Sequence, residues 1–358
     1  MRFPTLKNQE CLAGLYRSSI SLGLLLVVLS CFAGCDNDSV AEARLRVFGG
    51  LTMGTTYSVK INAVELEVAE KKIDKEIQSI LKKVNASMST YIKESELSLL
   101  NQSNAGTWIT LSEDLYQISE EAMSVSRLTD GHFDISVGAL VNLWGFGPQK
   151  SEIIPSKDEI EQAMSNSGSE HLQIQQSPPA LKKLKDNIYL DLSGIAKGYA
   201  VDKIAEYLIS LGIDNFLVEI GGEIRASGTN NIGFAWRIGI EQPEPEKQAV
   251  RRIIRLDNIA MATSGDYRNY FERDGRRYSH TIDPVSGYPI THNLASVTVL
   301  HAKTSIADAL ATGFLVMGKE AAGKIAQKNK LAVFFIEKTA SGFKESFTPE
   351  FEQCLLIK

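Results

Sequence analysis

The spacing of apolar residues predicts several helices along the chain. Over residues 64–84, apolar side chains recur every three or four positions, which is the pattern of a helix with one buried face. Ser112 stands before two acidic residues as a helix cap, and the helix that it opens is expected to stop at Gly131. Similar signals predict a helix from the capping box at Ser156 and helices over 195–211, 304–317 and 319–329.

Short apolar runs bounded by glycine predict strands, most of them in the second half of the chain. Residues 46–61 have the pattern of strand, turn and strand, with 53–57 in the turn, and residues 216–227 predict a hairpin around Gly221 and Gly222. Further strands are expected at 236–240, 251–256, 259–263, 278–282, 296–300 and 331–336. Many adjacent strands with a few helices favour an α+β fold with mixed or antiparallel sheets and packed helices over a doubly wound parallel sheet.

The N-terminal residues have the composition of a targeting segment. A basic stretch precedes an apolar run at 20–29, which is about as long as a signal-peptide core and too short for a comfortable membrane span. The small residues before Cys35 resemble a bacterial lipobox, in which the cysteine is lipidated and becomes the new N-terminus. Asp36 follows it and resembles the inner-membrane retention signal of some Gram-negative bacteria.

These signals predict three parts of the chain. We expect a lipoprotein signal peptide at 1–34, a polar tether at 35–44 and one domain at 45–358. The mature protein would then be lipid-anchored through Cys35 on the periplasmic side of the inner membrane. An ordinary signal peptide or an uncleaved anchor is the alternative interpretation.

Charge and cysteine content exclude several classes of protein. The sequence has 38 Lys and Arg against 43 Asp and Glu, a net charge of −5, which argues against recognition of nucleic acid through a basic surface. After removal of 1–34 and lipidation of Cys35, only Cys354 would remain, so no intrachain disulfide is expected. Cys354 stands in an apolar stretch and is predicted to be buried rather than nucleophilic.

Common catalytic motifs are absent from the sequence. It contains no dinucleotide-binding glycine motif, P-loop or nucleophile elbow. None of its five histidines belongs to a zinc-binding pattern, so a transition-metal site is not expected, whereas an oxygen site for a hard cation stays open.

Two segments could bind an extended ligand that carries a ring and a phosphate. Residues 130–147 alternate glycines and polar turn residues with aromatic ones, which suits a flat heteroaromatic ligand, although a glycine-rich loop with aromatic packing would look the same. Residues 191–202 predict a strand that runs into a helix, where the first amides and Lys197 could hold a phosphate. A plain turn with a solvated Lys197 is the alternative.

Two further segments could carry reactive groups. His280 and Asp283 flank a turn set by Pro284 and are close enough in sequence to serve one site, with His280 as a general base, unless this is only a surface turn. Asp308 and Thr312 are four residues apart on a predicted helix, so they share a face and offer the hard oxygen ligands that Mg²⁺ prefers. A helix-start acid and a threonine that bonds back to its own helix would give the same pattern.

Taken in order, these segments resemble the ApbE family, the FAD:protein FMN transferases. The resemblance covers about residues 46–336 and rests on several short motifs. These are 52–55, 88–91 with 95–96, 133–138, 142–147, 191–200, 221–222, 280–284 and 308–313.

The resemblance implies a compact α+β domain related to the tunnelling fold, which binds FAD and Mg²⁺. Such an enzyme transfers the FMN part of FAD to a Thr or Ser hydroxyl of a target protein through a phosphoester bond and releases AMP. Its acceptors would be membrane flavoprotein subunits, notably of the Na⁺-translocating NADH:quinone reductase or of Rnf-type complexes. A Mg²⁺-dependent FAD pyrophosphatase remains an alternative, as does a flavin-binding lipoprotein without catalysis.

The resemblance also implies a set of site residues. His280 is the expected general base, with Asp283 as a second catalytic candidate. The positions that match FAD contacts are Met53, Tyr91, His132, Phe133, Asp134, Asp191, Lys197 and Ile282. The positions that match metal ligands are Gly194, Asp308, Ala311 and Thr312. Gly194 can offer only its carbonyl oxygen. Many members have an Asp where Ala311 stands, so the metal ligand at this position would be a backbone oxygen or a water molecule.

Overall fold

The computed structural model describes residues 43–148, 150–151, 153–244, 249–266, 270–273 and 275–356. The predicted signal peptide, Cys35 and most of the predicted tether lie outside the described residues. From Ala43 on, the chain forms one compact unit. Its first strand begins at Arg44, one residue before the domain start that the sequence predicts.

The centre of the fold is an eight-stranded sheet in which every neighbouring pair is antiparallel, in the order β1-β2-β6-β7-β10-β13-β14-β15. The strands are β1 (Arg44–Thr52), β2 (Thr55–Ala63), β6 (Phe216–Ile220), β7 (Glu223–Ser227), β10 (Ile259–Gly265), β13 (Leu294–His301), β14 (Ala332–Thr339) and β15 (Gly342–Phe347). Nearly every residue of β13 is buried, because core layers cover both faces of the sheet at this strand.

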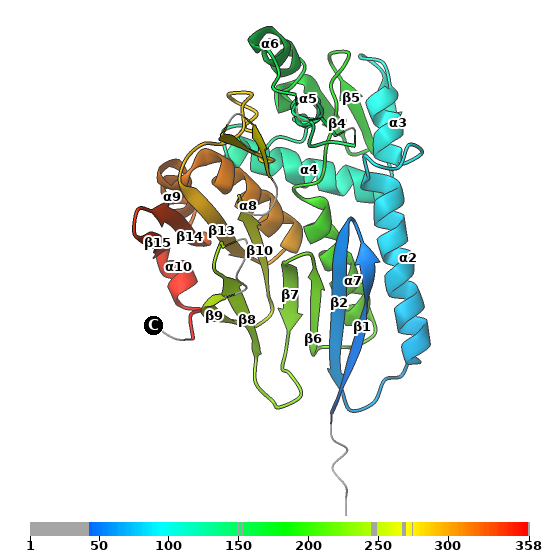
Figure 1. Cartoon of the computed structure of the whole chain (residues 1–358). Helices are drawn as coiled ribbons and strands as arrows, with labels where there is room; N and C mark the ends of the chain where they lie inside the picture. The colour runs from blue at the N-terminus through cyan, green and yellow to red at the C-terminus, as the bar shows by residue number, and fades with distance from the viewer. Residues whose placement is uncertain are drawn as a thin grey trace, which may run out of the picture. The chain divides into compact units, whose positions relative to one another are not determined.

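Three small sheets flank the large one. They are β3-β5-β4, β8-β9 and β11-β12. Their strands are β3 (Trp108–Thr110), β4 (Leu172–Gln175), β5 (Ala180–Lys183), β8 (Trp236–Glu241), β9 (Val250–Leu256), β11 (Tyr270–Arg273) and β12 (Arg276–Ser279). In Figure 1, the β11-β12 hairpin lies at the same end of the molecule as α5 and α6, above the upper ends of the central strands.

Helices cover one face of the central sheet. The helix α7 packs on β6 and β7, α8 packs on β10 and β13, and the two helices pack against each other (Figure 1). The helices are α2 (Glu70–Met88), α3 (Glu96–Gln102), α4 (Glu113–Leu128), α5 (Gly138–Leu143), α6 (Lys157–Ser165), α7 (Ala196–Ser210), α8 (Thr304–Met317), α9 (Lys319–Lys328) and α10 (Pro349–Glu352). A second core, which includes Trp236, Ile254 and Phe351, covers the other face.

Local signals explain several of these elements. The helix α2 buries Ile73, Ile77 and Leu81, which lie at helical spacing on one face. Ser156 opens α6 with a complete capping box, because its side chain accepts from the Glu159 amide while the Glu159 carboxylate accepts from the Ser156 amide. The predicted α+β class with antiparallel sheets and packed helices is confirmed.

The structure corrects several predicted boundaries. The strand expected at 278–282 ends at Ser279, since the turn that follows takes the chain out of the hairpin, and Ile282 forms only an isolated bridge with Pro289. Only Met53 and Gly54 lie in the first turn, both with positive φ, and α2 begins at Glu70 rather than near residue 64. Cys354 is half-buried against the second core, and burial raises the pKa of its thiol.

Candidate functional site

Lys197 stands between two buried carboxylates that come from other elements. Its Nζ lies 3.5 Å from Glu223 Oε1 and 3.6 Å from Asp308 Oδ2. Lys197 is in the first turn of α7, Glu223 begins β7, and Asp308 is in the second turn of α8. The packing of α7 on β7 and α8 therefore brings together Lys197 and Asp308, which are far apart in sequence.

The electrostatics of this group are set by burial. Burial alone would lower the pKa of Lys197, but the carboxylates of Asp308 and Glu223 outweigh it and raise that pKa. Burial raises the pKa of Glu223, with a smaller contribution from Asp308 and against the attraction of Lys197. Burial also raises the pKa of Asp308, opposed by Lys197 and the Gly198 amide. Lys197 therefore keeps its positive charge, and its side chain is 27% exposed.

Oxygen atoms next to this group form a set that could hold a hard cation. Both described polar contacts of Asp308 fall on Oδ2, from Lys197 and from the Gly198 amide at 3.1 Å, which leaves Oδ1 for a ligand. One turn further along α8, the Thr312 hydroxyl lies 3.1 Å from Ser264 Oγ. A Cβ added to Gly194 would lie 3.4 Å from Thr312 Oγ1, so the Gly194 backbone approaches that hydroxyl closely.

A carboxylate, a hydroxyl and a backbone carbonyl suit a magnesium-like ion, which prefers oxygen ligands. Asp308, Thr312 and Gly194 therefore fit such an ion. Ala311 is fully buried in α8 and has no side-chain ligand to offer. The described residues contain no group of three or more His, Cys, Asp or Glu side chains arranged for a metal, so the candidate site depends on mixed oxygen ligands.

His132 and Asp283 form a pair between two loops. His132 Nδ1 lies 2.9 Å from Asp283 Oδ1, although the two residues are 151 positions apart. Asp283 also accepts the amides of Val285 and Ser286, so its carboxylate caps the turn after β12. The sequence suggested that Asp283 and His280 serve one site, and the structure adds His132 as a direct contact of Asp283.

His280 lies beside a group of stacked aromatic rings. Its ring is 6.4 Å from that of Phe146, edge to face. Phe146 stacks on Phe271, and Phe271 stacks on Tyr278 with ring centroids 5.1 Å apart. Trp144 donates from Nε1 to the Gly287 carbonyl at 2.9 Å and thereby ties α5 to the turn after His280.

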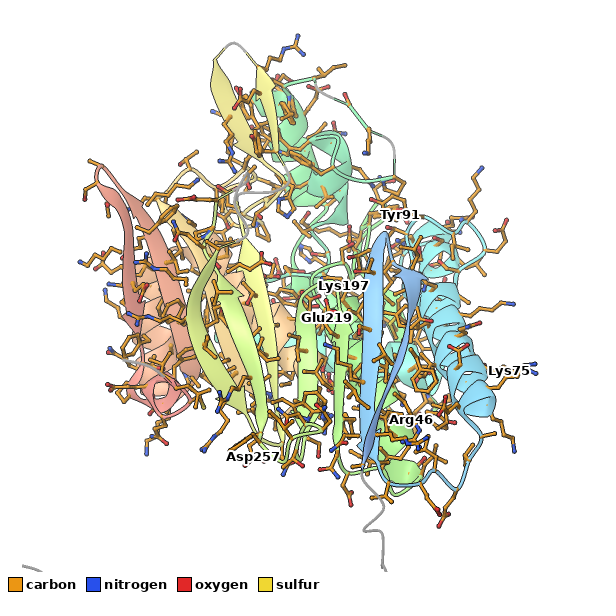
Figure 2. The ribbon with its side chains drawn as sticks, turned by 60° about the horizontal axis from the view of Figure 1, so that its bottom comes forward. Arg46, Lys75, Tyr91, Lys197, Glu219 and Asp257 are labelled. Carbon is orange, nitrogen blue, oxygen red and sulfur yellow. The ribbon has the colours of Figure 1, made fainter. Side chains whose placement is uncertain are left out.

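Several predicted flavin contacts lie at the same end of the central sheet. Met53 is in the β1-β2 turn and packs on the main core. Tyr91 is 66% exposed, and partial burial together with nearby Asp191 raises the pKa of its phenol. Figure 2 shows Tyr91 close to the β1-β2 turn and Lys197 in the same half of the molecule, while Asp257 lies at the opposite end.

Other predicted contacts are engaged within the protein. Asp134 is buried, and its carboxylate accepts hydrogen bonds from the amide and hydroxyl of Ser136 and from the Ser169 amide. Burial raises the pKa of Asp134 against these hydrogen bonds. Phe133 is 5% exposed, and a Cβ added to Gly194 would lie 3.2 Å from its ring. Ile282 is buried in a small apolar cluster with Trp144.

Glu223 is the residue of this group that the sequence interpretation missed. It directly follows Gly221 and Gly222, where the sequence predicts only the start of the second hairpin strand. The signal that could have found it is an acid as the first residue of a short strand whose apolar residues, Ile224 and Ala226, are buried by the sheet. An ionisable side chain in such a position needs a charged partner, which Lys197 supplies.

Two hollows in the described chain lie away from Lys197 and Asp308. One, of about 640 Å³, is lined by residues of the 62–68 and 210–215 segments. The other, of about 430 Å³, is bordered by Asp134, Gly168 and Pro284. Among the described helices, none is both long and apolar enough to cross a membrane.

The fold and this group of residues define an α+β protein with a buried cluster of Lys197, Glu223 and Asp308. The chain belongs to the ApbE family, whose family model matches residues 53–335. A relative from Vibrio cholerae, named FAD:protein FMN transferase, is 44% identical over 331 residues, which cover 92% of this chain and 97% of that protein. The family resemblance inferred from the sequence is thereby confirmed.

Solved structures agree with this assignment. The flavin transferase ApbE from Vibrio cholerae superposes with a TM-score of 0.81 at 44% identity and covers 87% of this chain and 100% of its own. The apo form of the Pseudomonas stutzeri flavinyl transferase ApbE superposes with a TM-score of 0.82 at 38% identity, over 88% of this chain and 98% of its own.

Proposed function

We propose that this protein is an FAD:protein FMN transferase, which moves the FMN part of FAD to a Thr or Ser hydroxyl of a target protein. Membership of the ApbE family and the names of its relatives support this activity. The observation that carries the proposal is the charged Lys197 beside Asp308, which lies one turn before Thr312 on α8. Positive charge in that place suits the pyrophosphate of FAD.

The reaction is a substitution at phosphorus. The acceptor oxygen forms a bond to the phosphorus of the FMN half, and the bridging bond from that phosphorus to the AMP phosphate breaks. AMP leaves with the bridging oxygen, and the hydroxyl proton passes to His280 as general base. A positioned base of this kind contributes about 10²–10⁴-fold to a rate.

Lys197 balances the charge of the pyrophosphate during this step. Its ammonium lies beside two carboxylates and its side chain is 27% exposed, so we infer that it contacts a phosphate oxygen. Asp308, Thr312 and the Gly194 carbonyl would hold Mg²⁺, which when bound supplies further charge neutralisation at the phosphates. Ala311 would contribute at most its backbone oxygen.

The flavin and adenine parts of FAD are proposed to lie along the loops around Lys197. The residues proposed for these contacts are Met53, Tyr91, His132, Phe133, Asp134, Asp191 and Ile282. The pairing of His132 with Asp283 supports a role for both in holding the turn after β12, which carries His280 at its start. Asp134 would contribute through the loop that it orders, because its oxygens already accept three hydrogen bonds.

One experiment separates this activity from FAD hydrolysis. The mature protein is incubated with FAD, MgCl₂ and a candidate acceptor subunit, and the acceptor is weighed by mass spectrometry. We expect the acceptor to gain one FMN unit, with AMP as the second product, and a Thr→Val acceptor at the modified position to gain nothing. Free FMN and AMP with an unmodified acceptor would instead identify a pyrophosphatase.

We also propose a location and a class of acceptors. Lipidation of Cys35 would anchor the protein on the periplasmic side of the inner membrane, near flavoprotein subunits of the Na⁺-translocating NADH:quinone reductase or of Rnf-type complexes. The short apolar segment before the small residues at 33–34 supports the lipid anchor. Cys35→Ala should move the protein out of the membrane fraction, and an unchanged fractionation without lipid on the N-terminus would contradict the proposal.

A further inference from the structure

Glu223 differs from the other buried acids in how its carboxylate is satisfied. It is 3% exposed, and its Oε2 is fully buried with no hydrogen-bond partner among the described residues. Its Oε1 lies 3.5 Å from Lys197 Nζ. Asp202, which is equally buried, accepts hydrogen bonds from Thr304 and Ser305 and pairs with Arg225. A buried acid whose role is to hold the fold usually has such partners, so Glu223 needs another explanation.

The second feature is that Lys197 and the proposed metal share one ligand. Asp308 contacts Lys197 through Oδ2 and would hold a cation through Oδ1. An ammonium and a divalent cation on the same carboxylate repel each other, because like charges a few ångströms apart interact strongly where water is excluded. With Asp308 as its only counter-ion, Lys197 would be pushed out of the site when the cation binds.

We propose that Glu223 is a positioning residue that holds Lys197 in place against the pyrophosphate while Asp308 serves the cation. This inference rests on the proposed function, since Lys197 is taken to contact the phosphates of FAD. Glu223 acts from behind Lys197: the carboxylate is buried, whereas the lysine side chain is 27% exposed and reaches the ligand. Second-layer partners of this kind typically contribute about 10–100-fold to affinity or activity.

A double-mutant cycle on FAD affinity tests the inference without relying on transfer. Glu223→Gln keeps the size of the side chain and removes its charge, and Lys197→Met removes the ammonium. FAD affinity is measured by quenching of flavin fluorescence, with MgCl₂ and with EDTA. In MgCl₂, we expect Glu223→Gln to weaken FAD binding by about 10-fold in the wild-type background and by less than about 2-fold in the Lys197→Met background.

The cycle has clear contradicting outcomes. Equal losses in both backgrounds would mean that Glu223 does not act through Lys197, and no loss in the wild-type background would mean that Glu223 has no effect on FAD binding. Either result overturns the inference. A protein that binds FAD with the expected non-additivity but never modifies an acceptor would instead contradict the proposed transfer reaction and leave the positioning role intact.

Thermal stability supplies a second, independent readout. Lys197→Met leaves two buried carboxylates without their cation, so its Tm should fall, and adding Glu223→Gln should restore part of the loss. Arg225→Leu is the matched control, because Arg225 lies two residues further along β7 and pairs with Asp202 instead. It should lower Tm without changing FAD affinity. If Glu223→Gln lowered the Tm of Lys197→Met further, the pairing would be excluded.

Discussion

Two polar clusters lie on the same three elements, α7, β7 and α8, and they are built in opposite ways. In the first, Asp202 on α7 pairs with Arg225 on β7 at 3.0 Å. It also accepts the amides of Thr304 and Ser305 at the start of α8, whose first amides have no partner within the helix. Every described polar contact of this cluster is short, which is what a structural clamp between elements requires.

The second cluster is nearer the start of α7 and uses longer contacts. Lys197 is 3.5 and 3.6 Å from Glu223 and Asp308, and one oxygen of Glu223 has no partner. The two clusters share their elements and their depth, so burial alone does not distinguish a functional acid from a structural one. Incomplete hydrogen bonding distinguishes the functional acid from the structural one. An unsatisfied buried carboxylate destabilises the fold, so we expect it to persist only where it serves ligand binding.

The largest expected difference between the clusters comes from Asp308→Ala. This change removes the only carboxylate among the proposed cation ligands, so FMN transfer should become undetectable, a loss of at least about 10³-fold. The measurement is flavin fluorescence of the acceptor after electrophoresis, and circular dichroism checks that the fold survives. Excess EDTA on the wild type should give the same loss, and a wild-type rate that resists EDTA would contradict the metal role.

The next largest effect is expected at His280. His280→Ala should lower FMN transfer by about 10²–10⁴-fold while FAD still binds, because the proposed flavin contacts other than Ile282 lie on other segments. In the wild type, the logarithm of the transfer rate should rise with pH through the range in which imidazole loses its proton and then level off. Weaker FAD binding and a lower Tm together would point to a structural role in the turn, and a normal transfer rate would move attention to Asp283.

Much of the fold and part of the site could be predicted because the signals are local. Ser112 and Ser156 cap helices where the sequence places them, and the hairpin at 221–222 turns where two glycines with positive φ allow it. Lys197 and Asp308 were proposed on separate grounds, as a phosphate contact and as a metal ligand, and the structure brings them within 3.6 Å.

The rest depends on contacts between distant segments. The pairing of His132 with Asp283 spans 151 residues, and no local pattern favours it over a contact with the nearby His280. Glu223 looked like an ordinary strand residue, because its burial comes from α7 and α8 packing over β7. The strand β5 was missed because Ala180–Lys183 is a four-residue segment with two lysines, and it pairs with β3 and β4 from other parts of the chain.

Disruption of the first cluster, which pairs Asp202 with Arg225, should lower the stability of the protein rather than its transfer activity. Asp202→Ala leaves Arg225 and the first amides of α8 without their partner, so the free energy of unfolding should fall by about 3–5 kcal/mol. Urea denaturation measures this loss. FMN transfer per folded molecule should stay at the wild-type level at low temperature. A loss of transfer without a loss of stability would mean that the two clusters are coupled and would break the comparison.

The smallest expected effects come from a matched pair of threonines on α8, one in each cluster. The Thr304 hydroxyl donates to Asp202 at 2.8 Å, so Thr304→Val should lower the free energy of unfolding by about 1.5 kcal/mol, the usual size for a hydrogen bond to a charged group. Among the described residues, the Thr312 hydroxyl contacts only that of Ser264. Thr312→Val should therefore cost less stability than Thr304→Val, but it would remove one ligand of the proposed cation.

Thr312→Val should therefore change cation affinity more than stability. We expect about a 10-fold higher Mg²⁺ concentration for half-maximal FAD binding, the usual size for a lost contact at a metal site. Thr304→Val should leave that concentration unchanged. The two variants carry the same chemical change on the same helix, so an equal Mg²⁺ requirement in both would remove Thr312 from the cation site. If only Thr312→Val raised the Mg²⁺ concentration for half-maximal FAD binding, Thr312 would be assigned to cation binding and Thr304 to stability.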